Sequence, residues 1–103
     1  MVIHELKIRK NFADAIADGT KTFEIRKNDR GYQTGDRLRF TVLDLIDGEV
    51  QPVIHPLDGR EYEIAYLLSG WGVALGYVAL GIREVSDEDA TPYDVEHGRS
   101  YEL

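Results

Sequence analysis

The sequence predicts a small, mostly β domain (α+β): a barrel of five or six short, mainly antiparallel strands with one short helix after the first strand. Three observations support this fold class. Apolar and polar residues alternate in several short segments, turn signals containing glycine separate these segments, and helical spacing of apolar residues occurs once, near the N-terminus. A chain of 103 residues suits one domain, which we expect at residues 1–85, followed by an acidic C-terminal tail at residues 86–103.

The order of the expected elements follows from these patterns. The helix lies between the first two strands, with Asn11 as a suitable N-cap and Asp18-Gly19 as its stop signal. Its apolar residues at helical spacing are Phe12, Ala15 and Ile16. The strands are expected at residues 2–9, 21–27, 37–45, 49–54, 60–68 and 77–85.

Alternation also assigns each strand side chain to a face of the sheet. In the second strand we expect Phe23 and Ile25 to face the core, which turns Thr22, Glu24 and Arg26 away from it. The other residues expected on the core side are His4, Leu6, Ile8, Leu38, Phe40, Val42, Tyr62, Ile64, Tyr66, Leu68, Val78, Leu80 and Ile82.

Two further local features concern the middle of the chain. Asp47-Gly48 is a hairpin signal, so the segment after it should return antiparallel. Arg37 and Arg39 should lie on the outward face and form solvated ion pairs with Glu61 and Glu63. Such exposed pairs contribute little to stability.

Composition limits the classes of function. The chain has no cysteine, so disulfides and thiolate metal sites are excluded, and a reducing cytoplasm is the expected location. No apolar run approaches the length of a membrane-spanning helix. His55 and His97 lack further ligands at metal-binding spacing, and neither a metal nor another cofactor is expected.

The distribution of charge carries more information than the total. A net charge of −7 opposes bulk affinity for nucleic acid. Residues 1–39 nevertheless contain nine of the twelve basic side chains and only six of the nineteen acidic ones. This asymmetry is compatible with a basic working face on an acidic body, or with charges that segregate between strands by chance.

The segment at residues 19–30 carries the most specific motif. Gly19, Lys21, Glu24 and Arg26 match the GxKxxExR signature, and the chain resembles the ASCH domain of the PUA-like β-barrel superfamily. It is most similar to a small bacterial and phage ASCH-type family of unknown function. The shared pattern consists of His4, Leu6 and Lys7, the core Gly-Thr-Lys-Thr-Phe-Glu-Ile-Arg-Lys-Asn-Asp-Arg at residues 19–30, Gly35-Asp36, and Gly76-Tyr77-Val78.

The resemblance implies a polar cleft that faces RNA or a nucleotide. Carried over by position, Lys21, Glu24 and Arg26 would line this cleft, where the two cations suit phosphate and Glu24 suits a base edge or holds Arg26. A structural ion-pair network is the alternative for these three residues. The other candidate ligand-binding residues, each with an alternative structural role in a turn or in packing, are Asn28, Arg30, His4, Trp71 and Tyr77.

Three functions are compatible with this reading. A module that binds RNA or a nucleotide is favoured. The second is a small hydrolase acting on RNA or on an acetylated cytidine, with Lys21 and Glu24 as candidate catalytic residues. Similar small hydrolases carry threonine three residues after the lysine, where this chain has Glu24 and its nearest hydroxyl is Thr22. The third is a protein-interaction or regulatory domain that uses the acidic half of the chain.

Overall fold

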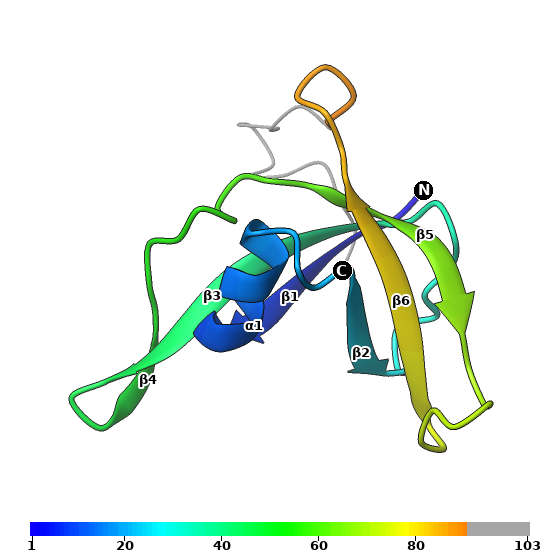
Figure 1. Ribbon diagram of the computed structural model, residues 1–103, viewed down its shortest axis with the longest axis horizontal. Helices are drawn as coiled ribbons and strands as arrows, with labels where there is room; N and C mark the ends of the chain where they lie inside the picture. The colour runs from blue at the N-terminus through cyan, green and yellow to red at the C-terminus, as the bar shows by residue number, and fades with distance from the viewer. Residues whose placement is uncertain (91–103) are drawn as a thin grey trace.

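The fold is a single six-stranded sheet that curls around a hydrophobic core, with one short helix against it (Figure 1). The computed structural model describes residues 1–90. Strands follow the order β1-β3-β5-β6-β2, and β4 extends the sheet by pairing with β3. The elements are β1 (Ile3–Arg9), α1 (Lys10–Ala17), β2 (Phe23–Lys27), β3 (Arg37–Ile46), β4 (Glu49–Pro52), β5 (Tyr62–Leu68) and β6 (Tyr77–Glu84).

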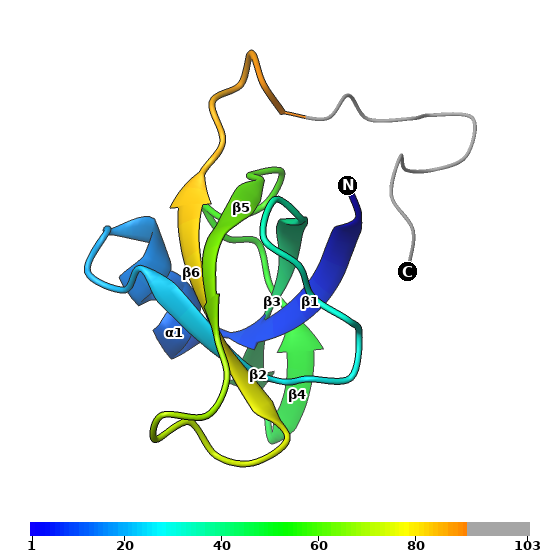
Figure 2. The ribbon, with the colours of Figure 1, turned by 90° about the vertical axis from the view of Figure 1, so that its right-hand side faces the viewer.

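The predicted mostly β fold with an early helix is confirmed, but the sheet is not a closed barrel. β1 and β2 are the two ends of the strand order and do not pair with each other. β1 is parallel to β3, whereas the remaining neighbours are antiparallel. Figure 2 shows the curled sheet from a second direction. We call the opening between β1 and β2 the seam.

The core lies inside the curled sheet and beneath α1. Alternation correctly assigned the inward faces of β1, β3 and β6, because their alternate residues are buried as predicted. The helix closes one end of the core with Ala13 and Ile16. The residues of this cluster are Leu6, Ile8, Ala13, Ile16, Tyr32, Leu38, Phe40, Val42, Leu57, Tyr62, Ile64, Val78, Leu80 and Ile82.

The start of the helix differs from the prediction. The chain passes directly from β1 into α1, so the N-cap position falls on Arg9, which makes no side-chain capping bond, and Asn11 lies inside the helix. This shifts the buried face toward Ala13 and Ile16 and leaves Phe12 46% exposed. The predicted stop is confirmed, because Asp18 is the C-cap and Gly19 has the left-handed φ of 85° that glycine tolerates.

An irregularity in β5 overturns two of the predicted core assignments. The pairing of β5 with β6 shifts register between Ile64 and Tyr66. Because one extra residue in a strand exchanges the faces of all residues beyond it, Tyr66 is 67% exposed and Leu67, rather than Leu68, packs against the core.

The hairpin between β3 and β4 is confirmed. Asp47 and Gly48 both have positive φ, 50° and 79°, as a two-residue turn that matches the twist of the strands requires. Of the predicted acidic tail, residues 86–90 form a turn after β6. Residues 91–103, including His97, lie outside the described part of the chain.

Candidate functional site

A groove of about 450 Å³ runs along the seam. It exists because β1 and β2 are the unpaired ends of the sheet, and the N-terminal turn of α1 covers one side of the gap. We call it the seam groove. It is lined by Lys7, Ile8, Arg9, Phe12, Lys21, Phe23, Glu24, Ile25, Arg26 and Lys27.

Glu24 lies at the centre of the seam groove and is only 5% exposed. One of its carboxylate oxygens accepts a hydrogen bond from the Lys21 amine, and the other accepts one from the Arg26 Nε at 2.9 Å. Each oxygen of the carboxylate therefore has a positively charged donor. The sequence motif brings its three charged side chains together in space.

The direction in which β2 faces was predicted wrongly. Phe23 and Ile25 do share one face, but they are 46% and 54% exposed, while Glu24 points into the seam. The physical reason is the pairing of β2 with β6, which places Glu24 opposite Leu80 and Arg26 opposite Val78. Leu80 and Val78 face inward, so the charged face of β2 is the inner one and its two apolar residues point outward.

Two arginines of the motif bridge the seam. Arg26 donates from Nη2 to the backbone oxygen of Lys7 at 2.8 Å, and Arg30 donates from Nη1 to that of Glu5 at 3.0 Å. These carbonyl groups belong to the side of β1 that has no neighbouring strand. The guanidinium groups thus satisfy backbone acceptors that a closed barrel would pair with another strand.

The charge of the seam groove is opposite in sign to that of the whole chain. Its lining contains five basic side chains and one acidic one, although the chain carries a net charge of −7. Lys21 and Arg26 are held by Glu24. Among residues 1–90, no ion pair is found for the other three basic residues, which are Lys7, Arg9 and Lys27.

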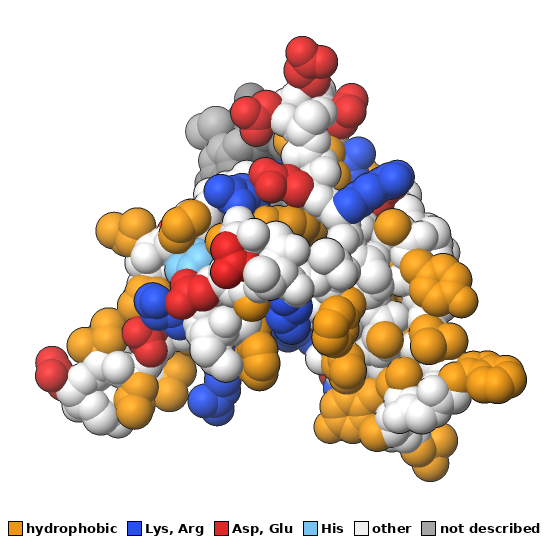
Figure 3. All heavy atoms as spheres, in the orientation of Figure 1, with side chains coloured by type: hydrophobic (Ala, Val, Ile, Leu, Met, Phe, Trp, Pro, Cys, Tyr) orange, Lys and Arg blue, Asp and Glu red, His pale blue; other side chains and the backbone are white. Residues whose placement is uncertain are grey.

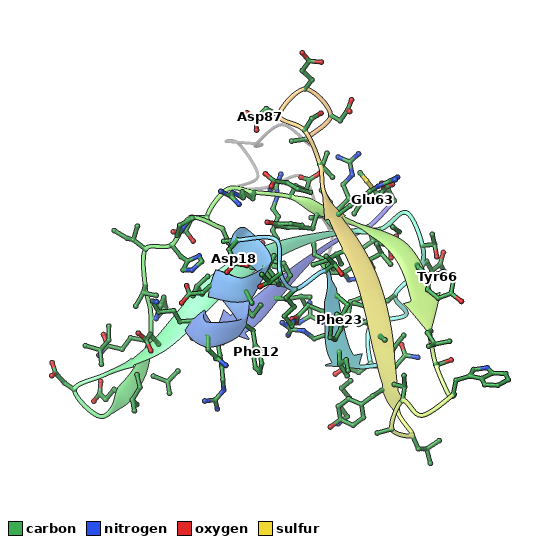
Figure 4. All side chains as sticks on the ribbon, in the orientation of Figure 1. Phe12, Asp18, Phe23, Glu63, Tyr66 and Asp87 are labelled. Carbon is green, nitrogen blue, oxygen red and sulfur yellow. The ribbon has the colours of Figure 1, made fainter. Side chains whose placement is uncertain are left out.

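Two aromatic rings border the same groove. The Lys21 amine lies 5.3 Å from the ring centre of Phe12 and 5.2 Å from that of Phe23. Figure 4 labels Phe12 on the helix and Phe23 on the side of β2. Both rings are about half exposed, so they offer apolar surface to a ligand while their contact with Lys21 holds the amine between them.

His4 occupies a different part of the molecule from the seam groove. It is 2% exposed, and its Nε2 lies 2.9 Å from Asp36 Oδ2. The centre of its ring lies 4.7 Å from the centre of the Tyr32 ring. Burial by itself raises the pKa of Asp36. The hydrogen bonds from His4 and from two backbone N–H groups outweigh this effect, so the pKa lies below its ordinary value of 3.8.

The remaining candidates lie at the far end of β2 and β6. The Asn28 backbone N–H donates to Gly76 O at 2.9 Å and thereby joins two loops. Tyr77 is opposite Lys27 in the sheet and 44% exposed, and Trp71 is 92% exposed in the β5–β6 loop. None of these three residues lines the seam groove.

Sequence reasoning named only Lys21, Glu24 and Arg26 among the groove residues, and those it missed include Lys7, Arg9, Lys27, Phe12 and Phe23. Lys7 and Arg9 alternate with the core residues of β1, and this pattern could have placed them beside the motif. Phe12 was assigned to the core because its spacing fits Ala15 and Ile16, and only the observed start of the helix places it at the groove.

The predicted solvated pairs on β3 also need correction. Glu61 is 1% exposed and accepts hydrogen bonds from Arg37 and Arg39, whereas Glu63 pairs with Arg83. The outward face of β3 at this point is covered, and Arg37 additionally donates to the backbone oxygen of Asp89. Glu61 is therefore the centre of a buried charge network.

Within the described range, no group of three or more histidine or acidic residues could hold a metal ion. None of the helices described is long and apolar enough to cross a membrane.

The fold and the groove define a small β-rich domain with an open curled sheet and a basic groove at its seam. A family model described as "Domain of unknown function (DUF3850)" matches residues 3–82, and the chain belongs to this family. It is also similar to the "Uncharacterized 12.9 kDa protein in GpA 3'region" of Escherichia phage P2, with 44% identity over 36 residues. That match covers 35% of this chain and 33% of the phage protein, so the chain spans about a third of that relative's length.

Proposed function

We propose that this chain is an RNA- or nucleotide-binding domain and that the seam groove is its binding site. The observation that carries the proposal is the local charge: five basic side chains line a groove in a chain with a net charge of −7. A cluster of this kind attracts anions, and the acidic remainder of the protein disfavours long nucleic acids. The ligand that fits best is therefore a nucleotide or a short single strand.

The groove has a separate group for each part of a nucleotide. Lys7, Arg9 and Lys27 are available for phosphate, since their charges are not neutralised by an acidic neighbour among the described residues. Phe12 and Phe23 offer ring faces on which a base can stack. Glu24 accepts hydrogen bonds and can pair with an amino group on the base edge, because each carboxylate oxygen accepts more than one bond.

The resemblance to the ASCH domain supports the same conclusion from the sequence. The motif residues Lys21, Glu24 and Arg26 lie together in the groove. In ASCH domains of the PUA-like superfamily, such residues are expected to line a cleft for RNA or nucleotides. We therefore propose membership of this superfamily together with the ligand class.

Titration of labelled short single-stranded RNAs and nucleotides, followed by fluorescence anisotropy, tests the proposal. Lys27→Ala and Arg9→Ala should each weaken binding several-fold, and raising the salt concentration should weaken it further because phosphate contacts release counterions. Arg83→Ala is the matched control. It removes one exposed charge, paired with Glu63 outside the groove, and should leave affinity unchanged.

Two outcomes would contradict the proposal: no RNA or nucleotide binds at low salt, or Arg83→Ala weakens binding as much as Lys27→Ala. The hydrolase alternative is tested in the same samples by chromatography of RNA and acetylated cytidine. Product that disappears in Lys21→Ala would assign a reaction to Lys21 and Glu24, whereas binding without product assigns recognition alone.

A further inference from the structure

The outer face of β2, β6 and β5 carries a continuous apolar surface. Strand register places Phe23, Gly81 and Tyr66 in one row and Ile25, Ala79 and Leu68 in the next. All six point away from the core, because the intervening residues of β2, β6 and β5 are the ones that face inward. We call these two rows, which contain no charged side chain, the apolar platform.

The loop between β5 and β6 extends the platform at one end. Trp71 is 92% exposed, Leu75 is fully exposed at 101%, and Tyr77 is 44% exposed. Figure 3 shows apolar side chains gathered over this end of the molecule, with few charged ones among them. Trp71 has a φ of 52°, a left-handed conformation that bulky residues rarely adopt. The loop thus holds a large apolar ring in water at a conformational cost.

The exposed apolar area is large enough for a stable interface. With roughly 150–250 Å² per large side chain at full exposure, Ile25, Tyr66, Trp71, Leu75 and Tyr77 together expose on the order of 550–900 Å². One partner in a standard interface contributes about 800 Å². The largest apolar patch on a typical monomer is only about 300–600 Å².

The middle of the platform carries small residues. Gly81 and Ala79 of β6 lie between the larger side chains of β2 and β5, and Tyr66 lies against Gly81. When two such faces pack about a two-fold axis, each copy contributes the same two rows. These rows carry no charge, so two acidic chains can meet there without juxtaposing like charges, and Lys27, opposite Tyr77, borders them on the same face.

From these observations we infer that the apolar platform and its loop dock a second copy of this chain in a symmetric, face-to-face dimer. Each copy contributes the same residues, as a two-fold interface requires. The dimer rests on observations separate from those for the proposed RNA or nucleotide binding. Phe23 and Ile25 belong to both the platform and the seam groove, so the two surfaces adjoin, but the residues substituted in the test, Tyr66 and Leu75, lie outside the groove.

Sedimentation velocity and light scattering of the full chain at micromolar concentrations test this inference. The wild-type protein should have twice the chain mass of 11.7 kDa. Tyr66→Lys and Leu75→Lys should each reduce the mass two-fold while the circular dichroism of the folded chain stays unchanged. Leu75 is fully exposed, so its substitution cannot disturb the core. Trp71 is the only tryptophan, and its emission should shift to shorter wavelength as the dimer forms.

Leu45→Lys is the matched control, since Leu45 is 65% exposed on the β3–β4 hairpin, away from the platform. It should leave the dimer intact. The inference is overturned if the wild-type chain is monomeric, if it forms open-ended oligomers, or if a dimer resists both platform substitutions. It is also overturned if Leu45→Lys dissociates the dimer as readily as Tyr66→Lys does.

Discussion

Glu24 and Glu61 present the same local chemistry in two different settings. Each is a buried glutamate with two basic side chains bonded to its carboxylate. Glu61 directly precedes β5, its carboxylate meets Arg37 and Arg39 of β3, and its side chain is 0% exposed. Glu24 lies at the seam, where the sheet ends and a groove of about 450 Å³ opens.

The difference shows that position in the sheet, rather than residue type, separates a structural ion pair from a candidate binding site. The charges around Glu61 are paired with one another within the described residues. At Glu24, three further basic residues stand beside the network without acidic partners in residues 1–90. The groove therefore has positive charge left over for a ligand.

Glu61→Gln should cause the largest loss of stability. Removing one partner of a buried charge network costs about 3–5 kcal/mol, because Arg37 and Arg39 would face each other without a counter-charge. Urea unfolding measures the change. The matched control is Glu63→Gln, which breaks a pair with the exposed Arg83 and should cost at most about 1 kcal/mol. Equal losses would mean that burial does not distinguish the two pairs.

Glu24→Gln should be less damaging. The basic partners of the two glutamates are similarly exposed, but the Glu24 side chain is 6% exposed and lines an open groove, whereas that of Glu61 is 0% exposed. Water can therefore reach the Glu24 network more easily when the charge is lost. We expect a loss of about 1–3 kcal/mol in urea unfolding. A loss as large as that of Glu61→Gln would remove the distinction between the seam and the sheet. Glu24→Gln should also change the proposed affinity for nucleotides, whereas the folded Glu61→Gln variant should keep the affinity of the wild type.

Asp36 is a third buried carboxylate, and it gives a test by pH. Hydrogen bonds from His4 and two backbone N–H groups lower its pKa below 3.8 in the folded state. The Asp36 carboxylate therefore binds a proton more readily in the unfolded chain than in the folded one. The stability that the ionised Asp36 contributes is complete above about pH 5, and it is lost as the pH falls through the lowered pKa. Asp36→Asn should lose stability at neutral pH, and its deficit relative to the wild type should shrink in acid. A deficit that is constant with pH would contradict this assignment.

Lys27→Ala should have the smallest effect on stability. Lys27 forms no ion pair within the described residues, and exposed substitutions of this kind usually change the free energy of unfolding by no more than about 0.5 kcal/mol. The same substitution should weaken nucleotide binding. Chemical unfolding together with anisotropy on one preparation measures both quantities, and a large loss of stability would show that Lys27 has a structural role.

Much of the fold could be predicted from local patterns. The inward faces of β1, β3 and β6 follow from alternation, and the hairpin at Asp47-Gly48 follows from the need for positive φ. The irregularity before Tyr66 could not be predicted this way, because it depends on how β5 pairs with β6. The helix start was missed for a related reason: the chain enters α1 without a loop, and no capping side chain marks the boundary.

The sequence by itself determined the inward faces of β1, β3 and β6, the early helix and the motif that joins Lys21, Glu24 and Arg26, because these depend on neighbours a few residues apart. Only the tertiary structure decided that β1 and β2 remain unpaired. The unpaired edges bring Lys7 and Arg9 beside the motif, while the pairing of β2 with β6 turns Glu24 inward and Ile25 outward. The physical reason is that the environment on each side of a strand is set by segments far away in the chain, which alternation along one strand does not encode.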